Sequence, residues 1–133
     1  MSTFTLNRAS HTATIIDEQL YVLGGGYSIS EAQDKIIGKQ FYRLSFSEPF
    51  FLNTQSIPWE DLTDKNIVPS NKRSAAVANG TTIILFGGQP IDPGDSMAII
   101  YTFDTTNLLW NIPKITGDYI PLNKSSLVAI KNR

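Results

Sequence analysis

The stretch Leu20–Gly25, with the sequence LYVLGG, governs the fold. It recurs 63 positions later as Ile83–Gly88, IILFGG. An apolar run that ends in two glycines and occurs twice indicates one supersecondary unit used repeatedly. Each copy should therefore have its own flanking elements.

Composition indicates a folded domain of nearly neutral charge. The 133 residues suffice for one domain with a buried core, and 41% of them are hydrophobic and 11% aromatic. The formal net charge is −1, and the basic residues are scattered from Arg8 to Arg133 without a cluster. Because a nucleic-acid groove needs a basic stripe, a nucleic-acid partner is not expected. The absence of cysteine excludes disulfides and thiolate sites.

Neither a signal peptide nor a membrane span is expected. Residues 1–8 lack the apolar core of a signal peptide. No run approaches the roughly 18 apolar residues that are needed to cross a bilayer. These features favour a cytoplasmic location.

The first unit reads as four antiparallel strands. Polar residues 17–19 separate the first two apolar runs, as in a hairpin, and Pro58 suits an edge strand that needs no ladder hydrogen bond. Residues 27–39 are polar and predict a surface loop with at most one helical turn. The expected strands are residues 10–16, 20–23, 41–46 and 57–62.

The second unit repeats the scheme, and a third begins. Asn79-Gly80 between apolar runs is a strong hairpin signal. Residues 124–131 resemble residues 73–78 at an offset of 51, and Trp59 and Trp110 are also 51 apart. A repeat of about 51 residues is therefore indicated. The expected strands of the second unit are residues 73–78, 82–86, 98–103 and 108–112.

Four strands per repeat, a glycine doublet after the second and a tryptophan in the fourth resemble the kelch β-propeller blade. The surrounding sequence resembles that of fungal kelch-repeat proteins, some of which are called galactose-oxidase-like. The residues that carry the resemblance are Arg8, His11, Leu20, Tyr21, Gly24, Gly25, Tyr42 and Trp59 in the first copy, and Arg73, Gly87, Gly88, Tyr101, Asp104 and Trp110 in the second.

The resemblance implies an all-β fold, a partial kelch-type propeller of four-stranded antiparallel blades. Blade 1 would span about residues 8–62, blade 2 about 73–113, and the first strand of blade 3 about 124–131. A kelch propeller, as the family implies, closes with six or seven blades, so the chain is expected to be a fragment of a longer protein. Because a terminal blade exposes apolar surface, self-association of the isolated chain is expected.

Neither catalysis nor a bound cofactor or metal is expected. The glycine doublet lacks the Lys-Ser/Thr pair and following helix of a phosphate loop. His11 is the only histidine; in the kelch-like register it lies on the first strand, where we expect it to be packed and hydrogen-bonded. One histidine and no cysteine cannot supply the copper site of galactose oxidase. The repeated tryptophans favour packing between blades over stacking on a sugar, and the carboxylate pairs read as solvated turns.

Binding is expected at one edge of the sheets. In an up-down meander, the second-to-third connections and the links between blades share an edge, and here these connections, residues 26–40, 63–72 and 89–97, are long. The resemblance favours a non-enzymatic scaffold that binds a protein partner; the alternative is a carbohydrate-binding or galactose-oxidase-like propeller whose active residues lie in other blades. The candidate contact residues are Tyr27, Gln33, Lys35, Gln89, Asp92 and Asp95.

Overall fold

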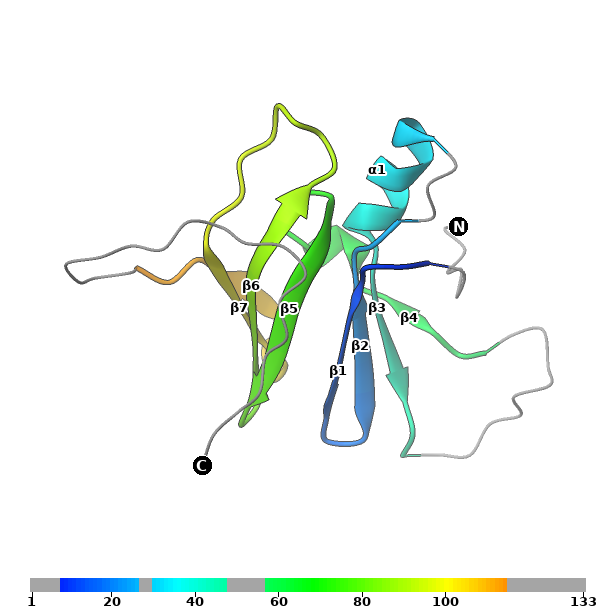
Figure 1. The fold of residues 1–133 in the computed structure, drawn as a ribbon. Helices are drawn as coiled ribbons and strands as arrows, with labels where there is room; N and C mark the ends of the chain where they lie inside the picture. The colour runs from blue at the N-terminus through cyan, green and yellow to red at the C-terminus, as the bar shows by residue number, and fades with distance from the viewer. Residues whose placement is uncertain (1–7, 27–29, 48–56, 115–133) are drawn as a thin grey trace.

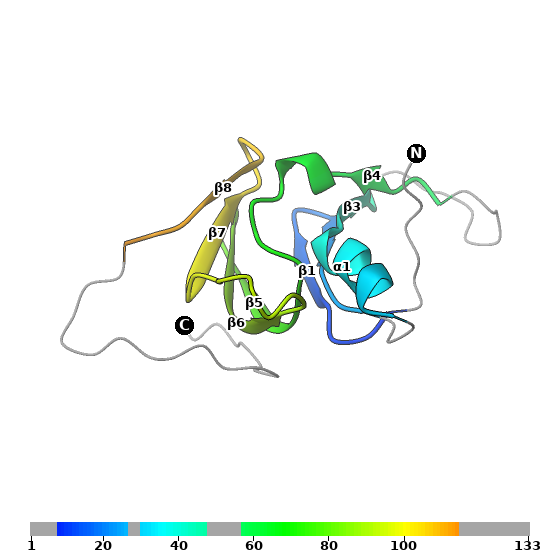
Figure 2. The same cartoon turned by 90° about the horizontal axis from the view of Figure 1, so that it is seen from above.

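The chain forms two four-stranded antiparallel sheets, in a computed structural model that describes residues 8–26, 30–47 and 57–114. The expectation of an all-β fold is confirmed. Figures 1 and 2 show the sheets side by side. The first contains β1 (Thr12–Ile16), β2 (Gln19–Leu23), β3 (Phe41–Ser45) and β4 (Glu60–Asp61), in that order; the second contains β5 (Asn71–Asn79), β6 (Thr82–Pro90), β7 (Ile100–Asp104) and β8 (Leu109–Asn111).

The hairpins close through residues with positive φ. Asp17 and Glu18 join β1 to β2 with φ values of 51° and 61°, the pattern of a two-residue type I′ turn. Gly80, with a φ of 61°, opens the turn between β5 and β6. Both turns match the right-handed twist of the strands that they connect.

The glycine doublets have the same conformation in both sheets. Gly24 and Gly25 have φ values of 73° and 92°, and Gly87 and Gly88 have values of 70° and 94°. The segment that faces each doublet also has a matching residue with positive φ. These residues are Ser10 and Arg73, which are 63 positions apart and have φ values of 61° and 62°. The sequence repeat is therefore also a repeat of backbone geometry.

The core lies between the two sheets. The ring centroid of Phe41 in β3 is 4.8 Å from that of Phe103 in β7 and 5.3 Å from that of Trp110 in β8. The packing between sheets that was expected of both tryptophans is thus confirmed for Trp110; Trp59 is half-buried and contacts Tyr42 of its own sheet. The edge-to-face pair Tyr101–Trp110, at 6.5 Å, is repeated in the first sheet by Tyr42–Trp59, also at 6.5 Å.

The prediction of a surface loop over residues 27–39 is wrong for most of that range, because helix α1 spans Glu31–Lys39. The Ser30 hydroxyl accepts a hydrogen bond from the backbone N–H of Gln33 at 3.2 Å, which caps the helix. Acidic residues in the first turn and Lys39 in the last suit the helix dipole. The side chain of Ile37 is buried, and α1 contacts β5.

Several strand limits also differ from those expected. Strand β5 begins at Asn71 instead of residue 73, and β7 begins at Ile100 instead of residue 98. Strand β4 has two residues and starts after Pro58, which cannot donate to a ladder. A single 3-10 turn, η1 (Thr63–Lys65), follows it.

Two of the expectations fall on residues that the structure does not describe: the first strand of a third unit at 124–131, and Tyr27 as a contact residue. Within the described ranges, no helix is long and apolar enough to cross a membrane.

Candidate functional site

Three of the connections lie together at one edge of the sheets, which we term the loop edge (residues 30–40, 63–70 and 91–97). The hydroxyl of Ser70 donates to the carbonyl of Lys35, and the backbone N–H of Ile91 donates to the carbonyl of Ser70 at 2.8 Å. The link between the sheets thus contacts both α1 and the β6–β7 connection. In Figure 1, α1 and this connection lie at the top, and the tight β1–β2 turn lies at the bottom.

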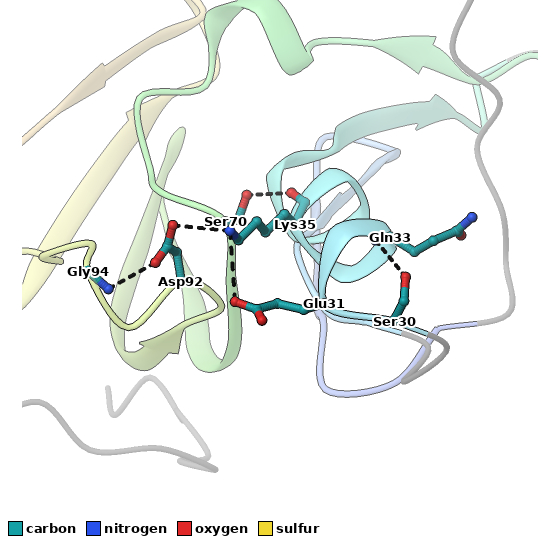
Figure 3. A network of polar contacts seen from close by, with 7 residues as sticks. All are labelled: Ser30, Glu31, Gln33, Lys35, Ser70, Asp92 and Gly94. Carbon is teal, nitrogen blue, oxygen red and sulfur yellow. Dashed lines mark hydrogen bonds and ion pairs between the residues drawn. The ribbon is translucent and has the colours of Figure 1, made fainter.

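An ion pair joins two of the predicted contact residues across the loop edge. The Nζ of Lys35 lies 3.2 Å from a carboxylate oxygen of Asp92 and 3.8 Å from Glu31 (Figure 3). The backbone N–H of Gly94 donates to the Asp92 carboxylate at 2.9 Å. This hydrogen bond and Lys35 hold the pKa of Asp92 below its usual value.

The electrostatics of Lys35 follow from the same contacts. Hydrogen bonding and attraction to Asp92 raise the pKa of Lys35, and Glu31 and Asp95 add to the increase from farther away. The backbone N–H of Asp95 also donates to the carbonyl of Asp92 at 2.9 Å, which closes the turn. The structure therefore brings Lys35 and Asp92 together, with Asp95 close by.

The other predicted contact residues do not join this cluster. Gln33 is exposed on α1, and its side chain points away from Asp92 in Figure 3. Gln89 is exposed within β6 and not in the loop where it was expected. Both remain accessible to a partner, but no contact in the described part of the chain links either side chain to the Lys35–Asp92 pair.

A buried polar network holds α1 in place. The guanidinium of Arg8 donates to the carbonyl of Gly24 at 3.1 Å and to the side-chain oxygen of Gln40, directly after the helix. Burial lowers the pKa of Arg8. The side-chain amide of Asn66 donates to the carbonyl of Lys39 at 2.9 Å, so the helix end is fixed from two sides.

Two grooves flank α1. One has a volume of about 370 Å³ and is lined by Lys35, Ile36, Lys39, Gln40, Thr63 and Ser70. The other has a volume of about 310 Å³ and is lined by Ser30, Glu31, Asp34, Lys72 and Ile91.

Of the residues that line the 370 Å³ groove, only Lys35 was predicted from the sequence as a contact residue. Ile36 and Lys39 were missed because no helix was expected there. The sequence Ser30-Glu31-Ala32-Gln33 contains a signal that could have predicted the start of this helix. Ser followed three residues later by Gln is typical of a helix start.

The expectation for His11 is wrong. The residue is exposed and precedes β1, where Ser10 turns the chain with a φ of 61°. Partial desolvation and the nearby Arg8 lower the pKa of His11. No group of three metal-ligating residues exists in the described ranges. Of the carboxylates, Glu60 pairs with Arg43, and Asp17 and Glu18 form the exposed β1–β2 turn.

No protein-family model matches the chain, and no curated protein matches it.

Proposed function

We propose that this chain is part of a kelch-type β-propeller and acts as a non-enzymatic scaffold that binds a protein partner through the loop edge. Two sheets with the same strand order, the same glycine conformation and the same Tyr–Trp pair support the blade interpretation. They pack face to face through aromatic side chains, as stacked repeats do.

The observation that carries the binding role is the convergence of α1, the β6–β7 connection and the link between the sheets. A helix with a side-chain cap and a loop closed by Asp92 give this edge defined shape. The turns that the structure describes in full at the opposite edge, residues 17–18, 80–81 and 105–108, are short and offer little surface to a partner. Recognition usually resides on long connections that a rigid scaffold displays.

A matched pair of isoleucines tests the proposed role. Ile36 on the loop edge is 65% exposed, and Ile15 near the opposite edge is 62% exposed. Because neither side chain is part of the core, Glu should be tolerated at both positions. In affinity capture with quantitative mass spectrometry, Ile36→Glu should lose a protein that wild type and Ile15→Glu both retain.

The alternative, a carbohydrate-binding or galactose-oxidase-like propeller, predicts a different result. Wild type would then bind glycans on an array, and no protein would depend on Ile36. That outcome would contradict the scaffold proposal.

A further inference from the structure

The 370 Å³ groove, which we term the α1 groove, has an apolar wall that faces solvent. Lys35, Ile36 and Lys39 lie within four residues of one another on α1, and Gln40 follows the helix directly; Thr63 and Ser70 line the groove from the link between the sheets. Ile36 is 65% exposed, more than the other exposed large hydrophobic side chains in the described ranges. An aliphatic side chain held open on a capped helix is available for contact with a partner.

The groove also has a cation that lacks a close counter-ion. The Nζ of Lys39 donates to the carbonyl of Val68 at 2.8 Å, and no carboxylate among the described residues lies within 4.0 Å of it. Asp95 acts on Lys39 only from farther away, and desolvation lowers the pKa of Lys39. A partly desolvated ammonium with one carbonyl partner has two further donors to offer.

The remaining polar groups of the α1 groove are compatible with an anion. None of its lining residues is acidic, whereas the groove on the other side of α1 contains Glu31 and Asp34. The Thr63 hydroxyl oxygen accepts a hydrogen bond from the backbone N–H of Phe41 at 3.1 Å. Its own proton has no acceptor among the described residues and remains free to donate.

We propose that the α1 groove is a docking site for a segment of a protein partner that carries a carboxylate beside an aliphatic side chain. The carboxylate pairs with Lys39 and the Thr63 hydroxyl, and the aliphatic group packs on Ile36. Lys35 is already neutralised by Asp92 and contributes its methylene stem. This inference rests on the proposed protein-binding function and names the chemistry of the partner.

The test uses a random octapeptide library displayed on phage and selected on wild-type protein. Enriched peptides should share Asp or Glu next to Leu, Ile or Val. A charge-assisted hydrogen bond should account for much of the affinity, so Lys39→Met should weaken the selected peptides about tenfold or more. Lys65→Met, which removes a lysine outside the groove, should leave the affinity unchanged.

Two further measurements keep the test decisive if Lys39→Met folds poorly. Ile36→Glu places a carboxylate in the groove at an exposed position and should repel the same peptides. The backbone amide NMR signals of residues 35–40 and 63 should shift when a selected peptide is added, and the affinity should fall as salt is raised.

The inference is overturned by enriched peptides without acidic residues, by unchanged affinity in Lys39→Met and Ile36→Glu, or by NMR shifts confined to the opposite edge. If wild type captures a protein in an Ile36-dependent manner but the peptides lack carboxylates, the proposed function stands and this inference fails. If capture is independent of Ile36, the proposed function itself fails.

Discussion

Gly88 combines a φ of 94° with close contact to Ser74. A Cβ at this position would overlap the Ser74 hydroxyl, and one at Gly25, its counterpart in the first sheet, would lie 2.6 Å from the carbonyl oxygen of Ala9. Each doublet therefore requires glycine both for its backbone conformation and for the close approach of the facing strand.

Replacement of Gly88 by alanine should destabilise the fold by about 3 kcal/mol, because left-handed strain and steric overlap add. Gly80→Ala is the matched control: its φ is also positive, at 61°, but no atom lies within 4 Å of the added Cβ. We expect a cost of about 1 kcal/mol there. Chemical denaturation of both variants measures the difference, and equal costs would contradict this explanation.

Trp110 is buried between the sheets, but its indole N–H has no hydrogen-bond partner in the described part of the chain. Packing, not hydrogen bonding, thus explains its presence. Trp110→Ala should cost about 3–5 kcal/mol, as large core truncations do. Trp110→Phe leaves no polar group unpaired and should cost about 1–2 kcal/mol. Similar losses in both variants, measured by thermal unfolding, would show that the indole N–H matters.

At the scale of elements, α1 and the β6–β7 connection depend on each other through Asp92. The pKa of Asp92 is lowered first by the Gly94 backbone N–H and then by Lys35. A depressed carboxyl pKa means that the stabilisation is present above the ordinary value of 3.8 and is lost as the pH falls through the lower, folded-state value.

Lys35→Met should therefore raise the pKa of Asp92 only in part, because the Gly94 hydrogen bond remains. Carboxyl carbon NMR over a pH titration measures this change. Glu31→Gln, which removes the more distant partner of Lys35, serves as the control and should have a smaller effect. A return of Asp92 to its ordinary pKa in Lys35→Met would show that the ion pair, not the backbone, dominates.

The strands could be predicted because alternating apolar residues and turn residues are local signals. The Asn79-Gly80 hairpin and the repeated doublet are examples. Helix α1 was missed because its polar surface outweighed the Ser30 capping signal. The contact of Lys39 with Val68 depends on tertiary packing, which sequence spacing does not encode. The exposure of His11 follows from the positive φ of Ser10, which sequence spacing does not encode either.

At the scale of the whole molecule, equivalent faces of the two sheets differ in burial. Tyr21, Leu23 and Phe41 are buried against the second sheet. Their counterparts in the second sheet by strand register, Ile84, Phe86 and Ile100, are only half-buried. Apolar side chains on such a face favour contact with a further sheet.

The isolated chain should therefore self-associate in a concentration-dependent manner, and Phe86→Ser should weaken the association. Ile67→Ser is the control, because Ile67 is half-exposed but lies in the link between the sheets. Sedimentation velocity at several concentrations measures the effect. A compact wild-type monomer at every concentration would contradict the expectation.

The most direct test of the proposed scaffold function is hydrogen exchange of the chain with and without the protein that Ile36→Glu fails to capture. We expect slower exchange in residues 30–40 and 91–97 and no change in the turns at 17–18 and 80–81. Protection confined to those turns, or to the face that contains Phe86, would contradict it.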